Sequence, residues 1–301
     1  MFTTIYIVFV YFLLFFIGAS FGSFMGVLND RLTSDGEIKL KNILGRSRCD
    51  SCQKVLGITQ LFPIFSIIFS RFKCSKCKSP IPYRYIVYEI VVGLIFLGTF
   101  ILTINNNFLN LESYLNFIFI VFNLCLLYLI FLADYKFQVI PDIYVLVGAV
   151  FTIIFNISLT TYQLVNLYLQ LKYNPLGKYL IKVGFFQDQA IYYLTPLLYT
   201  ILGAIVIYLF FYFLYAITKG RGMGGGDVKL SFYIAVFLGF PNMLIGTFLA
   251  FILGAVFGVS LILANKKHFG EKIAFGPFIV VATVITYFLG DYIWLWYTNL
   301  L

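Results

Sequence analysis

The chain alternates between long apolar runs and short stretches that carry most of its charge. A helix that crosses a membrane needs about 20 consecutive apolar residues, and seven runs have close to this length or more. An eighth run, residues 228–240, would form a helix only about 20 Å long, which is shorter than the apolar core of a membrane. Neighbouring helices must therefore shield it, or it must lie next to water. We predict an all-α polytopic membrane protein with about eight transmembrane helices, at residues 5–27, 85–104, 114–133, 139–157, 191–217, 228–240, 243–264 and 273–296.

Two longer polar stretches divide this pattern into parts. Residues 30–84 are charged and resemble a small soluble domain, although residues 58–69 inside them form a short apolar run. That run is too short to cross a membrane and is typical of a re-entrant or interfacial segment. Residues 158–190 form a long, tyrosine-rich connection. We predict a first transmembrane helix over 1–29, a separate domain over 30–84, and a seven-helix membrane domain over 85–301 with an outer loop at 158–190.

The composition excludes several classes of protein. Soluble globular proteins contain about 25% charged residues, whereas this chain of 301 residues has 11%, so most of its length is not a water-soluble domain. The 36 phenylalanines and 23 tyrosines also exclude a disordered chain. The single histidine, His268, excludes metal sites with two histidine ligands and disfavours histidine-based triads.

The positive charge predicts the orientation. Cytoplasmic loops of membrane proteins are enriched in lysine and arginine, and placing residues 30–84 in the cytoplasm puts 18 of the 21 basic residues on that side. In a soluble protein a net charge of +9 would suggest nucleic acid as a partner. Here anionic membrane lipids explain the charge more simply, so we expect membrane lipids and no nucleic acid as partners.

Four cysteines in the 30–84 domain have the spacing of a metal site. They form two C-x-x-C pairs, Cys49 with Cys52 and Cys74 with Cys77. Four thiolates can close a tetrahedron around Zn²⁺, and such a closed site is structural because it leaves no position for a reacting water. The alternatives are reduced thiols without metal or a redox pair. Cys125 lies in an apolar run and is expected to be a small core residue.

Five acidic residues lie at or within the apolar runs: Glu89, Asp134, Asp142, Asp227 and Asp291. A carboxylate at membrane depth is costly and is a functional candidate for that reason. Glu89 could pair with Arg84 or contribute to a site, and Asp291 could reach water at the end of the last run. Asp142 follows Pro141, and both residue types suit a helix start, although a direct catalytic role is also open.

Asp134 and Asp227 have the strongest case for chemistry. Asp134 ends one apolar run, and Asp227 follows the glycine-rich stretch 222–226 on the same predicted side of the membrane. Two facing carboxylates can share one proton, so that one activates a water while the other polarises a carbonyl. The glycines, Gly224 and Gly226 among them, would permit close approach of a substrate and a positive φ. A phosphate-binding loop is disfavoured because no G-K-[ST] sequence follows.

In this order the motifs resemble the bacterial type IV prepilin peptidases, membrane aspartic proteases of the GxGD type. The resemblance covers most of the chain outside 158–190. It rests on six motifs: the first-span signature (residues 22–27 with Arg31), the two C-x-x-C pairs, the entry to the second span (82–85 with Glu89), the first aspartate motif (Asp134 with 140–142), the GxGD motif (224–230) and the last-span signature (275–278). The first-span signature commonly has Asn at the position of Gly26.

The resemblance implies an endopeptidase in the bacterial cytoplasmic (inner) membrane, with its active site facing the cytoplasm. It would remove the short basic leader from prepilin or pseudopilin precursors after a glycine, with Asp134 and Asp227 as the catalytic pair. Gly224, Gly226, Lys229, Asp142 and Glu89 would be substrate-binding or supporting residues. Many family members also methylate the new N-terminus with S-adenosylmethionine, although the sequence shows no clear loop for that cofactor.

Two other classes of function use some of the same features. A transporter or channel could use acids in the membrane to carry protons or cations, but it would not account for the glycine-rich loop or the cysteine pairs. A non-catalytic assembly subunit could use a zinc domain to bind other proteins. Cleavage of a precursor by the wild type and by Asp→Asn variants distinguishes these alternatives from a peptidase.

Overall fold

The structure is a computed structural model, and it describes residues 2–32, 48–49, 51–55, 57, 62–104, 111–264 and 274–300. In these ranges the regular secondary structure is helical, and isolated bridges pair Arg48 with Val55 and Lys73 with Pro80. The all-α prediction is confirmed. The chain divides into two compact units, Met1–Ala133 and Asp134–Leu301, while the domain boundaries drawn from the sequence stay a prediction.

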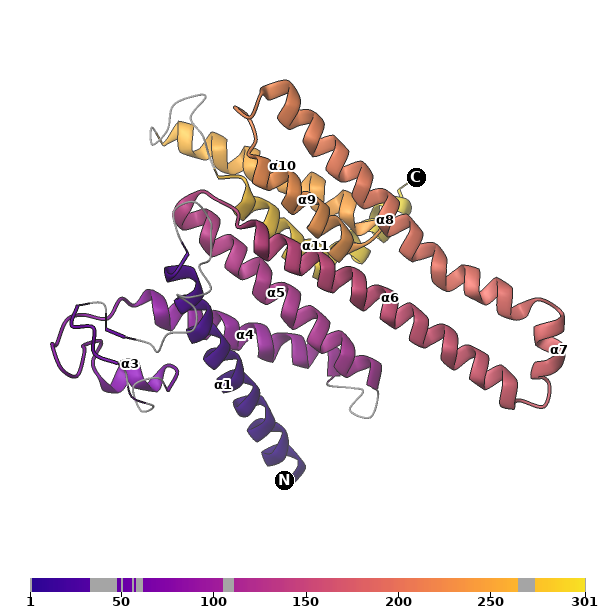
Figure 1. Cartoon of the computed structure of the whole chain (residues 1–301), viewed down its shortest axis with the longest axis horizontal. Coiled ribbons are helices and arrows are strands. Elements are labelled where there is room, and N and C mark those ends of the chain that lie inside the picture. Colours follow the sequence, from indigo (N-terminus) through magenta and orange to yellow (C-terminus); the bar gives the residue numbers. More distant parts are fainter. Residues whose placement is uncertain are drawn as a thin grey trace. The chain divides into compact units, whose positions relative to one another are not determined.

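The first unit contains two helices that pack along their lengths in opposite directions. These are α1 (Phe2–Asp30) and α4 (Arg84–Ile104), with the short helix α3 (Phe65–Phe69) beside them (Figure 1). Most of α5 (Leu111–Phe137) also belongs to this unit, and its Phe117 contacts Phe96 and Phe100 of α4 with ring centroids 6.3 and 5.7 Å apart.

Glycines allow α1 and α4 to approach closely. α1 carries Gly18, Gly22 and Gly26 at intervals of four residues, which places them on one face of the helix. A Cβ at Gly22 would lie 2.5 Å from the carbonyl oxygen of Tyr88, and one at Gly26 would lie 2.9 Å from the Tyr88 ring. A residue larger than glycine at position 26 would therefore collide with the Tyr88 ring.

The second unit is a bundle of helices around the short helix α9 (Gly225–Leu238). Its other helices are α6 (Asp142–Tyr173), α7 (Gly177–Lys182), α8 (Phe185–Thr218), α10 (Asn242–Leu263) and α11 (Gly276–Thr298) (Figure 1). α9 has 14 residues, and two of its large side chains, Leu230 and Tyr233, are completely buried. Gly148 of α6 packs on the Tyr233 ring, and Phe237 stacks on Tyr287 of α11 at 5.0 Å. The prediction that neighbours shield this short helix is confirmed.

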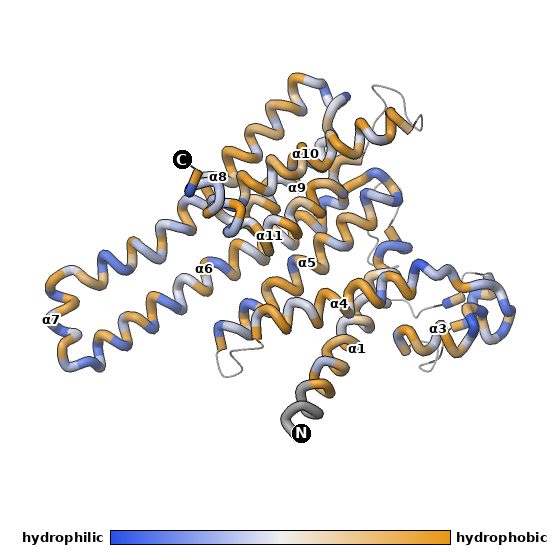
Figure 2. Tube along the Cα trace, turned by 180° about the vertical axis from the view of Figure 1, so that it is seen from behind, coloured by the Kyte–Doolittle hydropathy of each residue, from blue (hydrophilic) through white to orange (hydrophobic). Residues whose placement is uncertain are grey.

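The connection at 158–190 differs from the predicted outer loop. It is almost entirely helical, because α6 continues to Tyr173, α7 follows, and α8 already begins at Phe185. The polar residues that suggested a loop are interspersed among tyrosines, leucines and valines within these helices, and Figure 2 shows this mixed hydropathy around α7.

Seven helices in the described part of the chain are long and apolar enough to cross a membrane. They are Val8–Asp30, Arg84–Ile104, Leu111–Phe137, Asp142–Tyr173, Phe185–Thr218, Asn242–Leu263 and Gly276–Thr298. Together with the short α9, they correspond to the eight predicted runs. The protein is therefore a multi-pass membrane protein.

Candidate active site

Asp134 lies in the last turn of α5 with its side chain buried, and only 4% of the residue is exposed. Its Oδ2 atom is buried and has no hydrogen-bond partner among the described residues, while the carboxylate interacts with the backbone N–H of Gly276. A Cβ at Gly276 would lie 2.5 Å from Oδ2. Because any larger residue would collide with the carboxylate, glycine at the start of α11 is what permits this arrangement.

Asp227 lies in the first turn of α9 and is 7% exposed. Its Oδ2 accepts a hydrogen bond of 3.1 Å from the backbone N–H of Gly224, the residue that precedes the helix. This is the half of a capping box that the third helical residue supplies. The bond fixes the Asp227 carboxylate relative to the glycine-rich stretch that leads into α9.

The two aspartates of the second unit are brought together by Ile140. A Cβ added to Gly226 would lie 3.0 Å from the Ile140 side chain, and a Cβ added to Gly276 would lie 3.2 Å from the same side chain. Gly226 neighbours Asp227 in sequence, and Gly276 contacts Asp134. The carboxylates also interact electrostatically with each other, so the structure places both acids in one buried site.

The glycine-rich stretch serves close packing more than unusual backbone angles. The positive φ expected within residues 222–226 is absent, because Gly224 has a φ of −76° and α9 begins at Gly225. The left-handed residues lie just upstream, at Lys219 with φ 49° and Gly220 with φ 72°. These two residues end α8 and turn the chain toward α9, while Gly224 and Gly226 permit close approach to Asp227 and Ile140.

Lys229 and Asp142 form an ion pair of 2.6 Å between α9 and the first turn of α6. Both side chains are more than half exposed, at 53% and 69%. Pro141 and Asp142 begin α6, as their residue types suggest. Asp142 thus has a cationic partner, whereas Oδ2 of Asp134 has no hydrogen-bond partner among the described residues. The Lys229–Asp142 ion pair is therefore better suited to holding α6 against α9 than to proton transfer.

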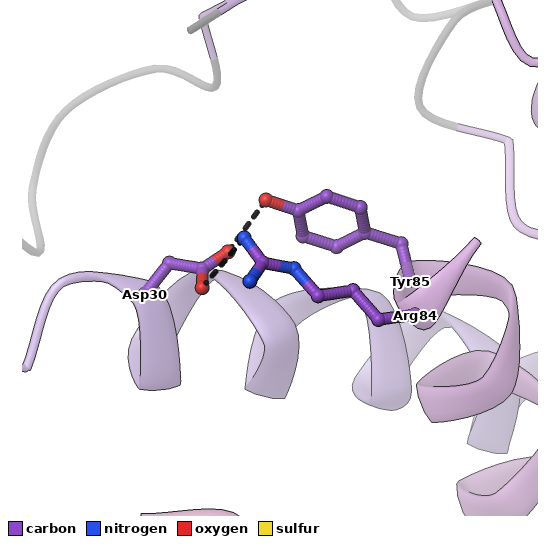
Figure 3. A network of polar contacts seen from close by, with 3 residues as sticks. All are labelled: Asp30, Arg84 and Tyr85. Atoms are coloured by element: carbon purple, nitrogen blue, oxygen red, sulfur yellow. Dashed lines mark hydrogen bonds and ion pairs between the residues drawn. The ribbon is translucent and has the colours of Figure 1, made fainter. Parts of the chain in front are cut away.

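Glu89 belongs to the first unit and does not pair with Arg84. Its buried carboxylate accepts a hydrogen bond of 2.6 Å from the backbone N–H of Ile64. Arg84 instead forms an ion pair of 3.2 Å with Asp30, to which the Tyr85 hydroxyl also donates a hydrogen bond (Figure 3). Both acids therefore connect parts of the first unit to one another.

The four cysteines of the 30–84 domain form one cluster in the first unit. Their Sγ atoms all lie within 4.8 Å of one another, with Cys49 3.7 Å from Cys77 and Cys52 4.0 Å from Cys74. Four sulfurs at about 2.3 Å from a tetrahedral Zn²⁺ would be about 3.8 Å apart. The cysteines are free thiols rather than disulfides, and the cluster has the size that a four-coordinate metal requires.

The two C-x-x-C segments have the same local fold. In each, the backbone N–H of the first cysteine bonds to a carbonyl five residues later, Cys49 to Lys54 at 3.0 Å and Cys74 to Ser79 at 2.9 Å. Hydrogen bonds from the backbone of Cys52, the Ser79 side chain and the backbone of Ser51 lower the pKa of Cys49 to about 6. A thiol with such a pKa is a thiolate at neutral pH, which is the form that binds a metal. The pKa of Cys77 is also lowered, whereas burial and the neighbouring thiols raise the pKa of Cys52 to about 11, so a metal would have to displace the proton of Cys52.

The chain matches two models of known protein families. Residues 16–103 match the family described as bacterial peptidase A24 N-terminal domain, and residues 121–259 match the type IV leader peptidase family. The chain belongs to the type IV leader peptidase family. The first match contains the four cysteines, and the second contains Asp134 and Asp227.

Curated relatives match most of the chain. A Bacillus subtilis (strain 168) protein named prepilin leader peptidase/N-methyltransferase is 26% identical over 279 residues, which are 93% of this chain and 94% of the relative. Proteins of the same name from Aeromonas salmonicida (strain A449) and Neisseria gonorrhoeae are each 27% identical, over 84% and 89% of this chain and 75% and 79% of their own. No solved structure matches.

Sequence reasoning did not select Ile140 or Gly276 as site residues. Both lie in motifs that support the family resemblance, so position in a motif was a usable signal. Their roles depend on contacts between helices distant in sequence, and an apolar side chain and a glycine carry no chemical mark of their own. Asp30 was likewise not considered, although its position beside Arg31 at the end of an apolar run makes it a residue that needs a partner.

Proposed function

We propose that Asp134 and Asp227 are the catalytic pair of a membrane aspartic endopeptidase that processes type IV prepilins or pseudopilins. Family membership and the named relatives support prepilin processing. The observation that carries the residue assignment is the shared site: both carboxylates are buried, they interact with each other, and Oδ2 of Asp134 has no hydrogen-bond partner among the described residues.

The proposed chemistry needs only the two acids and a water. One carboxylate takes a proton from the water as its oxygen attacks the carbonyl carbon of the scissile bond, while the other, protonated, donates to the carbonyl oxygen. The tetrahedral intermediate then collapses, the C–N bond breaks, and the leaving nitrogen takes up a proton. The contact of Gly276 with Asp134 and the bond from Gly224 to Asp227 hold the two carboxylates in place for both steps.

We propose that the four-cysteine cluster binds Zn²⁺ as a structural ion, with Cys49, Cys52, Cys74 and Cys77 as its ligands. The ion would hold the two C-x-x-C segments together, because few hydrogen bonds of helices or strands do so in the described part of the chain. Methylation of the processed N-terminus with S-adenosylmethionine is proposed on the names of the relatives alone.

The proposed orientation follows the distribution of charge. Residues 30–84 and the active site would face the cytoplasm, at the surface of the inner membrane, where the basic loops would meet anionic lipid. A precursor with a short basic leader would be cut there, after a glycine, while its apolar segment stays in the bilayer.

The test uses the full chain in membranes with a pilin-type precursor. Mass spectrometry of the product should show cleavage at the leader boundary by the wild type and none by Asp134→Asn or Asp227→Asn. A mass increase of one methyl group that depends on added S-adenosylmethionine would show the second activity. Cleavage at the wild-type rate by either Asn variant would contradict the assignment of Asp134 and Asp227 as the catalytic pair. If the wild-type enzyme leaves the precursor intact, a transporter or an assembly subunit is favoured.

A further inference from the structure

The segment Phe62–Phe69, which contains α3, packs against the middle of a membrane helix rather than against its end. The Phe65 ring stacks on Phe16 of α1 with centroids 5.4 Å apart, and Phe62 lies 6.3 Å from the same ring. Figure 1 shows α3 beside α1. Peptidase chemistry at the two aspartates does not account for an apolar segment in this position.

The depth of this contact follows from α1. Phe16 lies 14 residues before Asp30, where α1 ends at its ion pair with Arg84. At a rise of 1.5 Å per residue, Phe16 is about 21 Å along the helix from that polar end. The stretch Val8–Asp30 has the length and hydropathy of a membrane span, so Phe16 lies within its apolar part.

The partner helix also places this contact below the polar end, at a smaller depth. Gly93 of α4 packs against the Phe15 ring of α1, next to Phe16 in sequence. Gly93 lies nine residues after Arg84, the first residue of α4, which corresponds to about 14 Å. Two helices thus place the Phe65 ring well below the level of the Asp30–Arg84 ion pair.

The backbone of this segment is hydrogen-bonded as a membrane interior requires. Unpaired N–H and C=O groups cost several kcal/mol in hydrocarbon. The N–H of Ile64 donates to the Glu89 carboxylate, and donors to carbonyls within the segment are the N–H groups of Phe65, Ser66, Ile68 and Ser70. Glu89 therefore supplies the acceptor that the first turn of α3 lacks.

Residues with positive φ turn the chain into and out of the segment. Ile64 has a φ of 63°, which is costly for a β-branched residue. Arg71 and Phe72, at 51° and 58°, turn the chain back after α3. The hydrogen bond from Ile64 to Glu89 holds the strained backbone at Ile64 in place. Sharp turns therefore lie at both ends of α3, and the segment Phe62–Phe69 is referred to as the hairpin.

The outer face of the hairpin is apolar and continuous with the exposed face of α1. Phe69 is 81% exposed and Phe62 54%, and α1 exposes Phe9, Phe12 and Ile17 at similar levels. Beyond the hairpin the chain becomes basic, with Arg71, Lys73, Lys76 and Lys78. Figure 2 shows the change from hydrophobic colour on α3 to hydrophilic colour on the cysteine-containing loops.

We propose that Phe62–Phe69 inserts into the hydrocarbon core of the membrane from the Asp30 end of α1 and anchors the cysteine domain to the membrane. Acyl chains cover the exposed phenylalanines, and the basic residues that follow meet the phosphate headgroups. The occupant is lipid because the apolar face continues that of a membrane span and ends in a cluster of positive charge.

Tryptophan fluorescence in vesicles tests this proposal with the full chain. The two native tryptophans are first replaced, as Trp294→Phe and Trp296→Phe, and one tryptophan is then introduced as Phe69→Trp. Lys76→Trp serves as the control for a site in water, and Leu94→Trp on the exposed face of α4 as the control for a site in lipid. The vesicles contain phosphatidylcholine and phosphatidylglycerol with brominated acyl chains, and acrylamide is the aqueous quencher.

The lipid anchor predicts that the brominated chains quench the Phe69→Trp variant as strongly as the Leu94→Trp control. Acrylamide should quench the Phe69→Trp variant several-fold less than the Lys76→Trp control. Strong acrylamide quenching without bromine quenching would overturn the proposal by placing the segment in water. Protection from both quenchers would also overturn it, because protein rather than lipid would then cover the segment. Phe62→Trp repeats the measurement if Phe69→Trp fails to fold, as judged by its zinc content.

Glu89 variants test the hairpin's attachment. Glu89→Ala removes the acceptor for the Ile64 N–H and should make the tryptophan introduced at position 69 more accessible to acrylamide. Glu89→Gln keeps an acceptor oxygen and should have a smaller effect. Equal quenching in the parent and both variants would contradict the role given to Glu89. Because fluorescence is the readout, the outcome is independent of whether the chain cleaves prepilins.

Discussion

The acids of the two units differ in what they contact. In the first unit, Asp30 is paired with Arg84 and Tyr85, and Glu89 accepts the N–H of Ile64. In the second unit, Asp134 leaves Oδ2 buried without a hydrogen-bond partner among the described residues, and it interacts electrostatically with another carboxylate, Asp227. Glu89 is as buried as Asp134 and Asp227, so burial does not separate a structural acid from the proposed catalytic pair.

The difference lies in what faces the carboxylate. A buried polar atom without a partner costs stability and persists when it serves another purpose. Asp30 and Glu89 face a cation, a hydroxyl or an amide and hold elements together. Asp134 and Asp227, although each interacts with a backbone N–H, also interact with each other, and Oδ2 of Asp134 has no hydrogen-bond partner among the described residues, so this pair is available to bind a proton and a water. The predictions that follow test this distinction, beginning with the largest effect.

Removing either catalytic carboxylate should have the largest effect. Asp134→Asn and Asp227→Asn are each expected to reduce the cleavage rate by at least about a thousandfold, because the two acids act as a unit. The double variant should be no slower than the slower single variant. Single-turnover cleavage of a precursor by the three variants measures this, and multiplicative losses would show that the acids act independently.

Removing a cysteine ligand should abolish metal binding. Cys49→Ser is expected to lose the zinc, about one ion per chain by the four-ligand arrangement, while the matched control Cys125→Ala should keep it because Cys125 is buried in α5, outside the cluster. Elemental analysis of purified protein decides this. Equal zinc content in the two variants would contradict the proposed ligands.

The zinc site should also weaken with acid. The pKa of Cys49 is lowered to about 6 by hydrogen bonds from Cys52, Ser79 and Ser51, so this thiol is ionised at neutral pH without metal. Protons compete with Zn²⁺ for all four sulfurs, and falling pH therefore lowers the affinity. Zinc retained against a fixed chelator should decrease steadily from about pH 8 to about pH 5, and retention independent of pH would exclude thiolate ligands.

Disturbing the carboxylate geometry should have an intermediate effect. Gly276→Ala would place a Cβ 2.5 Å from Oδ2 of Asp134 and should slow cleavage by about 10- to 100-fold. Gly98→Ala is the matched control, because no atom lies within 4 Å of a Cβ at that helical position. Similar cleavage rates for the two alanine variants would show that the Asp134 carboxylate has room to move.

Removing a structural acid should affect stability modestly. Asp30→Ala breaks the ion pair with Arg84 and the bond from Tyr85, and a cost of about 1 kcal/mol is expected because the pair is partly exposed. Asp30→Asn keeps an acceptor for Tyr85 and should lose less. Thermal unfolding in detergent measures both variants, and a more stable Asp30→Ala protein would remove Asp30 from the structural group.

The sequence was sufficient for the helices and the cysteine cluster, because each has a local signal. Apolar length predicts a span, and C-x-x-C spacing predicts a metal site. The catalytic role of the two aspartates stays a prediction. The sequence was insufficient at residues 158–190, where polar residues within helices resembled a loop. It was also insufficient for Ile140, Gly276 and the bond from Ile64 to Glu89, since those contacts join residues that only the tertiary packing of helices brings together.

The most direct test measures cleavage and thermal stability on the same sample of Asp134→Asn. If the buried carboxylate serves chemistry at a cost in stability, this variant should lose cleavage while its unfolding temperature stays equal to or rises above that of the wild type. Retained cleavage would contradict the catalytic role of Asp134. Loss of cleavage together with a clearly lower unfolding temperature would place Asp134 with the structural acids instead.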